Sequence, residues 1–239
     1  MPERLQKLIA QAGLTSRRKA EAWIIQGRVL LNGRPAQLGD RADLSCDQVE
    51  VDGRKLASAE KQVTVLLNKP RGYVTTLDDP QGRAQVTDLL KAIPQRLFPV
   101  GRLDYNTEGL LLLTNDGDLA QHLSHPRHHV RKTYLVKASG QLSKAMIDRL
   151  QQGIVLEDGP TAPAEVVRVR RVGTHCWFEL SLYEGRNRQV RRMCEAIGLQ
   201  VSRLKRIQLA FLDLSGVATG NYRRLREAEV TRLKEQSFR

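Results

Sequence analysis

Apolar positions in the first 56 residues fall into short periodic runs that predict two helices followed by hairpin strands. Residues 5–12 place apolar side chains at the i, i+3, i+4, i+7 spacing of an amphipathic helix. Thr15 or Ser16 can start a second helix, because hydroxyl side chains are favoured N-caps. The pairs Asn-Gly at 32–33 and Asp-Gly at 52–53 stand beside short apolar runs, a pattern typical of β-hairpins.

From residue 63 onwards, strand and helix patterns alternate without a regular β-α-β period. A largely apolar run predicts a strand at 63–67, and a continuous apolar run predicts a buried strand at 110–113. Alternation predicts antiparallel strands at 165–172 and 176–182. A mixture of this kind favours an α+β domain on an antiparallel sheet.

Helical patterns are expected between these strands at 86–92 and 118–123. Ser143 can cap a further helix that reaches about residue 152, with Ala145, Met146 and Leu150 on its apolar side. The small, polar stretch 57–62 predicts a linker. It divides the chain into a module of residues 1–56 and a domain of residues 63–239.

Composition restricts the class of protein. No apolar run approaches the roughly 18 residues of a transmembrane helix, and the polar N-terminus has no mark of a signal or transit peptide. Three cysteines without Cys-x-x-Cys spacing indicate reduced thiols and neither a disulfide framework nor a zinc site. A cytoplasmic protein is expected, and a monomer, since no self-complementary apolar patch is evident.

The charge points to a polyanionic partner. The chain has 39 Lys and Arg against 26 Asp and Glu, a net charge of +13. Nucleic acid is favoured over an anionic membrane, because no basic amphipathic helix with exposed bulky apolar residues is present. Residues 1–35 alone hold seven Lys and Arg against two acids. The candidate RNA-binding residues in this region are Arg4, Arg17, Arg18, Lys19 and Arg28.

The run 17–19 lies in the first turn of the predicted second helix, where cations oppose the helix dipole. A bound phosphate would make this placement favourable, although an ordinary solvated basic face is the alternative. Arg4-Leu-x-Lys-x-Ile-Ala, Ser16-Arg-Arg-Lys-Ala-Glu and Gly27-Arg-Val-x-Leu-Asn-Gly resemble the α-L RNA-binding module of the ribosomal-protein S4 type. The resemblance implies that this region binds structured RNA and catalyses nothing.

The segment 101–109 is rich in glycine and polar residues and leads directly into the apolar run 110–113. Such a loop sets charged side chains at the rim of a core, where functional residues concentrate. A turn with incidental charges is the alternative. Gly101-Arg-Leu-Asp with Asn106-Thr-x-Gly-Leu closely resembles the catalytic motif of pseudouridine synthases that act on ribosomal RNA. Three further motifs fit in order, namely Asn68-Lys-Pro-x-Gly-Tyr, Lys132-Thr-Tyr and Glu184-Gly-Arg-Asn-Arg-Gln-Val-Arg-Arg.

The resemblance implies a mixed, mainly antiparallel sheet flanked by helices, and it assigns roles to four residues. Asp104 matches the essential aspartate, which either attacks or stabilises C1′ of the sugar or assists proton removal from the sugar. Arg186 matches the arginine that pairs with this aspartate, and a surface arginine is the alternative. Tyr134 matches a tyrosine of the base pocket, and a core tyrosine is the alternative. Arg102 matches a residue that helps hold the target base out of the stack.

A helix is expected over 187–197, with Val190, Met193 and Ile197 on its inner face. Its outer face would carry Arg188, Arg191 and Arg192 as a track for RNA phosphates.

No cofactor motif is present, and isomerisation needs none. The histidines between 122 and 129 lack a metal-binding spacing, so no metal is expected. Residues 187–192 and 201–207 resemble the branch acting on large-subunit ribosomal RNA, while the segment 126–129 is shared with small-subunit enzymes and keeps that substrate open. A noncatalytic RNA-binding or ribosome-assembly protein is the alternative from another functional class.

Overall fold

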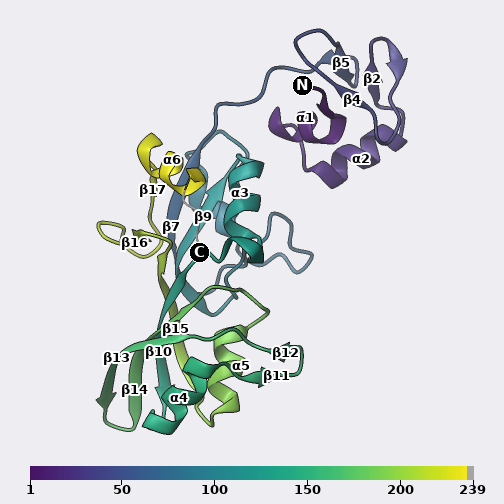
Figure 1. Cartoon of the computed structure of the whole chain (residues 1–239). Helices are drawn as coiled ribbons and strands as arrows, with labels where there is room; N and C mark the ends of the chain where they lie inside the picture. The colour runs from purple at the N-terminus through teal and green to yellow at the C-terminus, as the bar shows by residue number, and fades with distance from the viewer. Residues whose placement is uncertain (236–239) are drawn as a thin grey trace. The chain divides into compact units, whose positions relative to one another are not determined.

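The computed structural model describes residues 1–235, which form two compact units (Figure 1). The first comprises Met1–Val63 together with Pro94–Arg96 and Asn115–Gly117, and the second comprises the remainder. No helix within residues 1–235 is long and apolar enough to cross a membrane.

The N-terminal unit packs two helices on short hairpins. Its elements are β1 (Glu3–Arg4), α1 (Leu5–Gln11), α2 (Arg17–Ile25), β2 (Val29–Leu31), β3 (Arg34–Pro35), β4 (Arg41–Ala42), β5 (Val49–Val51) and β6 (Arg54–Lys55). Of the two candidate caps, Ser16 starts α2, where its hydroxyl accepts from the Lys19 amide at 3.2 Å. Asn32 and Gly33 both have positive φ, 51° and 78°, as a type I′ hairpin turn requires.

The second unit is built on a nine-stranded sheet with the order β13-β14-β10-β15-β9-β7-β17, to which β16 and β8 add short edges. Among the strand pairs of this sheet within residues 1–235, only β9 and β15 run parallel, so the sheet is mixed and mainly antiparallel, as the resemblance implied. Its strands are β7 (Thr64–Lys69), β8 (Phe98–Pro99), β9 (Thr107–Thr114), β10 (Lys132–Ser139), β13 (Glu165–Val172), β14 (His175–Leu182), β15 (Val201–Leu209), β16 (Leu212–Asp213) and β17 (Tyr222–Arg224).

The sheet has two halves, one formed by β13, β14, β10 and β15 and the other by β9, β7 and β17, and different helices cover each half. They are α3 (Gly117–Ser124), α4 (Lys144–Gln152), α5 (Gln189–Ala196) and α6 (Glu227–Glu235), with the 3₁₀ turns η1 (Val86–Leu90) and η2 (Pro126–His128) and the hairpin β11 (Val155–Leu156)–β12 (Gly159–Pro160). One core lies under α4 and α5 and contains Val136, Phe178 and Met193. A second core contains Leu110 and Leu119. Strand β15 contributes to both cores, through Leu204 to the first and Leu209 to the second.

Two local expectations are refined by the structure. Ser143 caps α4 by accepting from the Met146 amide at 3.3 Å, and Leu150 is fully buried. Ala145 is exposed and Ile147 packs against the core in its place. Ile147 and Leu150 are three residues apart and therefore lie on the same face of α4, which packs against the core. The short helix expected over 86–92 is a 3₁₀ helix of residues Val86–Leu90.

The parallel pair of β9 and β15 joins the two halves of the sheet. Leu204 lies opposite Thr107, and Arg206 lies opposite Gly109. Gly109 has φ +105°, and a Cβ there would lie 2.2 Å from the Arg206 carbonyl oxygen. Glycine is therefore required where the two strands approach, immediately after the candidate catalytic loop.

Candidate active site

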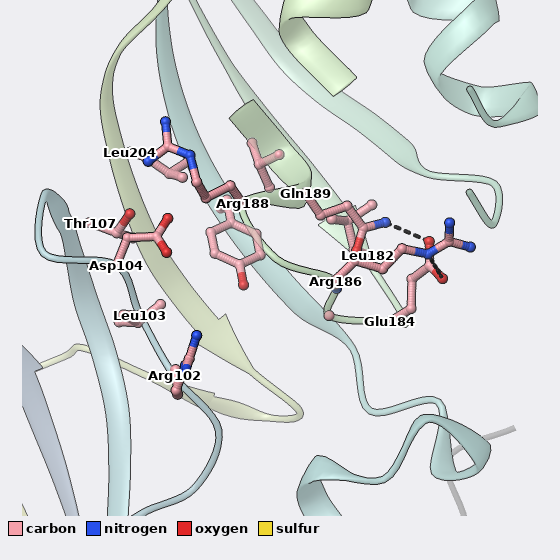
Figure 2. A pocket seen from close by; sticks show the side chains of 13 residues that line it. Arg102, Leu103, Asp104, Thr107, Leu182, Glu184, Arg186, Arg188, Gln189 and Leu204 are labelled. Carbon is pink, nitrogen blue, oxygen red and sulfur yellow. Dashed lines mark hydrogen bonds and ion pairs between the residues drawn. The ribbon is translucent and has the colours of Figure 1, made fainter. Parts of the chain in front are cut away.

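A pocket opens at the junction of the two sheet halves, between the loop before β9 and the start of α5 (Figure 2). It collects all four residues that the resemblance singled out, which are supplied by three separate segments of the chain. Its lining consists of Arg102, Leu103, Asp104, Thr107, Tyr134, Leu182, Glu184, Gly185, Arg186, Arg188, Gln189, Val190 and Leu204.

The backbone of the candidate catalytic loop is held from several directions. The Thr75 hydroxyl donates to the Leu103 carbonyl at 2.7 Å and accepts from the Leu103 amide at 3.3 Å. The Thr107 amide donates to the Asp104 carbonyl at 2.9 Å. These bonds fix the main chain around Asp104 and leave its side chain free to face the pocket.

Lys69 is the largest fully buried side chain of the protein within residues 1–235, and it lies beneath this loop. Its ammonium group donates to the carbonyl of Asp104 at 3.1 Å, of Thr107 at 2.9 Å and of Pro70 at 3.1 Å. Burial lowers the pKa of Lys69 to about 8, although the charges of Asp104 and Glu108 oppose the shift. Lys69 thus brings a positive charge close to Asp104 and fixes its main chain.

The carboxylate of Asp104 has no hydrogen bond or ion pair within residues 1–235. Neighbouring acids differ. Glu108 pairs with Arg203 at 2.9 Å, and Glu184 pairs with Arg186 at 3.2 Å. In a chain with a large excess of cations, Asp104 is a partly exposed acid that forms no ion pair within residues 1–235, and it borders a cavity.

Arg186 does not pair with Asp104, contrary to the expectation. It turns away from that carboxylate and toward Glu184, as Figure 2 shows. Its guanidinium also donates to the Asp158, Gly159 and Pro160 carbonyls. The physical reason is that the β11–β12 turn presents three carbonyl oxygens together, and a planar guanidinium with five donors can bond to them while it also pairs with the Glu184 and Asp158 carboxylates. Arg186 therefore joins the pocket wall to the hairpin.

The outer basic stripe of α5 is only partly available for a ligand. Arg192 forms two hydrogen bonds to Asp158, at 2.9 and 3.0 Å. Arg191 is partly buried and donates to the carbonyls of Val201, at 3.2 Å, and Asn106, at 3.4 Å. Burial lowers the pKa of Arg191, and Asp104 opposes this shift, so the charge of Arg191 acts on the pocket. Arg188 is exposed and forms no side-chain bond within residues 1–235.

Arg188 is the N-cap residue of α5 and has a left-handed backbone with φ 47°. Its guanidinium extends toward Leu204, on the side of the pocket where Asp104 lies (Figure 2). A left-handed arginine is uncommon, and such strain is often retained at functional sites. Of the three arginines proposed for the phosphate track, Arg188 alone presents a guanidinium without a protein partner in the described chain.

The candidate RNA-binding residues of the N-terminal unit also divide into exposed cations and one arginine that is bonded within the protein. Arg4, Arg17, Arg18 and Lys19 are exposed, in agreement with a surface that can meet RNA. Arg28 is partly buried, forms a bidentate bond to Asp52, at 2.8 Å through Nε, and lies 4.6 Å from the Trp23 ring centroid. Arg28 therefore connects α2 to the β5–β6 hairpin.

The role of Lys69 was not predicted, although its motif was recognised. A lysine two residues after the apolar run 65–67 was the available signal, because an ammonium group buried at the end of a strand needs several acceptors. The histidine region holds no metal cluster within the described part of the chain. The His122 and His128 rings instead lie 4.3 Å apart.

Comparison with known proteins identifies the family of the chain. Residues 63–196 match the family of RNA pseudouridylate synthases, and residues 3–49 match the S4 domain. The chain is 49% identical to the ribosomal large subunit pseudouridine synthase B of Bacillus subtilis, over 97% of this chain and 96% of that protein. It is 43% identical to an uncharacterized RNA pseudouridine synthase of Aquifex aeolicus, over 98% and 94% of the two chains.

A crystal structure of a pseudouridylate synthase is also similar, with 31% identity and a TM-score of 0.67, covering 96% of this chain and 99% of that one. Sequence, fold and the pocket around Asp104 agree on one assignment. The chain belongs to the RNA pseudouridine synthase family and carries an N-terminal S4 domain.

Proposed function

We propose that this enzyme isomerises a specific uridine of large-subunit ribosomal RNA to pseudouridine, with Asp104 as the catalytic carboxylate. The substrate is taken from the Bacillus subtilis relative, which aligns over nearly the whole of both chains. The exposed cations of the S4 domain, among them Arg17 and Arg18, suit binding to structured RNA.

The observation that carries the proposal is the state of Asp104. An unpaired carboxylate in a basic pocket is free to act on a substrate. In the reaction the N1–C1′ bond of uridine breaks, the uracil turns, and C5 joins C1′, while C5 loses a proton and N1 gains one. Asp104 would stabilise or attack the electron-poor C1′, or assist proton removal from the sugar to give a glycal-like intermediate.

The other pocket residues divide the remaining tasks. The Tyr134 ring can stack on the extruded base, and its hydroxyl forms no hydrogen bond in the described chain, so it can meet the proton lost from C5. Arg102 is exposed at the rim and can occupy the space that the flipped base leaves. Arg188 would hold a phosphate next to the target nucleotide, since its exposed guanidinium has no protein partner in the described chain. Arg186 holds the pocket wall in place.

Tritium release from RNA carrying 5-tritiated uridine tests the chemistry, because C5 exchanges its hydrogen for carbon. We expect release by the wild type and none by Asp104→Asn, with unchanged RNA affinity, since the two side chains have the same shape. Arg192→Ala is the matched control, because the Arg192 guanidinium is already hydrogen-bonded to the Asp158 carboxylate. This variant should still release tritium. Release by Asp104→Asn at the wild-type rate would remove Asp104 from the reaction.

The choice of ribosomal RNA needs a separate experiment. Carbodiimide-dependent reverse-transcription stops, mapped in both ribosomal RNAs of a deletion strain, should disappear at a position of the large-subunit RNA. Complementation with the wild-type gene should restore the stop, and complementation with Asp104→Asn should not. A stop lost from the small-subunit RNA alone would overturn the proposed substrate while leaving the chemistry intact.

A further inference from the structure

The half of the sheet formed by β13, β14, β10 and β15 has one covered face and one open face. Figure 1 shows α4 and α5 on the same side of these strands. Val136 and Phe178 point to that side and are fully buried. Side chains alternate along a strand, so Lys137 and Trp177 point to the opposite side. Both are partly exposed there, while Arg170 and Arg203 are exposed.

The strand register places these four residues in one row. Arg170 lies opposite Trp177, Trp177 lies opposite Lys137, and Lys137 lies opposite Arg203. Directly opposed residues of antiparallel strands share a face. The row therefore crosses four strands, a span of about 14 Å for three strand spacings of ~4.8 Å. We call it the Arg170–Arg203 row.

Charge on this face is strongly positive. Lys205 lies in the next layer of the same face, opposite Leu135. The acid of that layer, Glu179, is already paired with Arg168 at 2.8 Å. Arg203 pairs with Glu108, which is buried at 6% exposure, and still exposes about half of its own side chain, 52%. The face thus attracts a polyanion and has little free acid to repel one.

Trp177 gives the row an aromatic surface between two cations. The Lys137 ammonium lies 5.7 Å from the centroid of the Trp177 ring. A partly exposed aromatic ring flanked by cations is the arrangement with which proteins bind single-stranded nucleic acid, as bases stack on the ring and phosphates meet the cations. Sheet faces with exposed aromatic residues bind unpaired RNA bases in the same way.

This face is distinct from the catalytic pocket. Tyr134 and Leu204 line the pocket, and they occupy positions of β10 and β15 that alternate with those of Lys137 and Arg203. We propose that the Arg170–Arg203 row is a further RNA-binding site, apart from the S4 domain and the catalytic pocket, which stacks one base of an unpaired RNA segment on Trp177 and holds the adjoining phosphates with Arg170, Lys137 and Arg203. It rests on the proposed function only in identifying that segment with the substrate RNA.

Trp177 itself is a probe for this site, because the chain has two tryptophans and Trp23→Phe leaves Trp177 alone. In the full chain with that change, a short oligouridylate should quench the indole fluorescence at low salt. The double variant Arg170→Ala, Lys137→Ala should weaken the binding, and its affinity should fall less steeply with salt, by about one unit of slope for each phosphate that the protein no longer neutralises. Lys144→Ala is the matched control, because Lys144 is an exposed lysine, 81%, of α4.

The contribution to substrate binding is measured with a ribosomal RNA fragment and otherwise wild-type protein. Trp177→Ala should raise Kd and KM about 5- to 100-fold, as expected for loss of one stacked base, with kcat unchanged. Trp177→Phe, which keeps an aromatic ring, should recover most of the affinity. Circular dichroism checks that each variant is folded, and the double variant tests the site even if Trp177→Ala fails to fold.

Three results would overturn the proposal. The first is that oligouridylate does not quench the Trp177 fluorescence. The second is that the double variant binds oligouridylate with an affinity within twofold of the parent protein. The third is that oligoglutamate quenches equally, which would assign the face to an acidic protein partner. When Asp104→Asn is added to the Trp23→Phe protein, oligouridylate should still quench the Trp177 fluorescence to the same extent, because the catalytic pocket lies on the other face of the sheet. A failure of the proposed function would instead appear as absent pseudouridine formation with quenching retained.

Discussion

Replacing Gly109 by alanine should break the connection between the two sheet halves. Gly109 lies between Lys69 of β7 and Arg206 of β15. At φ +105°, an alanine would cost about 1–3 kcal/mol in backbone strain. The added Cβ would also lie 2.2 Å from the Arg206 carbonyl oxygen and 2.8 Å from its amide nitrogen, where ordinary contact begins at 3.4 Å. Both atoms belong to the backbone, so the strands must separate by about 1 Å.

That separation weakens hydrogen bonds of the β9–β15 ladder, each with a net contribution of about 1 kcal/mol. Strain and weakened bonds together predict that Gly109→Ala lowers the free energy of unfolding by about 3–5 kcal/mol. Activity should fall with it, because Thr107 lines the pocket two residues away.

Two glycines separate the contributions in urea denaturation. Gly220 has φ +85° and nothing within 4 Å of an added Cβ, so Gly220→Ala should show the backbone cost alone, about 1–2 kcal/mol. Gly117 has neither a positive φ nor a close neighbour, so Gly117→Ala should leave the stability unchanged or slightly raised. If Gly109→Ala matched Gly220→Ala in stability, the clash between β9 and β15 would not exist and the reasoning would be refuted.

Three further predictions concern the pocket. Burial holds the pKa of Lys69 at about 8, below its value of about 10.4 in the unfolded chain. The buried charge therefore destabilises the folded protein below pH 8, and this destabilisation disappears as the pH rises from 8 to about 10.4. Over that window, urea titrations should show wild type gaining up to about 3 kcal/mol relative to Lys69→Met, and the similar shift of Lys132, present in both proteins, cancels. Arg186→Ala should lower the free energy of unfolding by about 2 kcal/mol because its charged hydrogen bonds disappear, whereas Arg188→Ala should stay within about 0.5 kcal/mol and reduce RNA turnover; equal thermal shifts would contradict this division. Thr75→Val should lower kcat roughly tenfold, or about 1.4 kcal/mol, with little change in KM in the tritium assay, and an unchanged kcat would show that the loop needs no such support.

The sequence by itself determined much of the local structure and pointed to the candidate catalytic motif. Ser16 and Ser143 cap their helices, and the Asn-Gly pair at 32–33 forms its hairpin turn, because these features depend on neighbouring residues alone. The apolar run 110–113 is buried as a central strand. Periodicity also identified the inner face of α5, where Val190 and Met193 are buried.

The tertiary structure decided which groups meet. Periodicity says which side of an element is buried, but strand order decides what lies opposite. The parallel pairing of β9 with β15, the partner of Arg186 and the acceptors of Lys69 all follow from that order. A guanidinium or ammonium pairs with the acceptors nearest in space, so Arg186 bonds to the β11–β12 turn and leaves Asp104 unpaired. Likewise, only the register of four strands reveals that Trp177 stands in a row of cations.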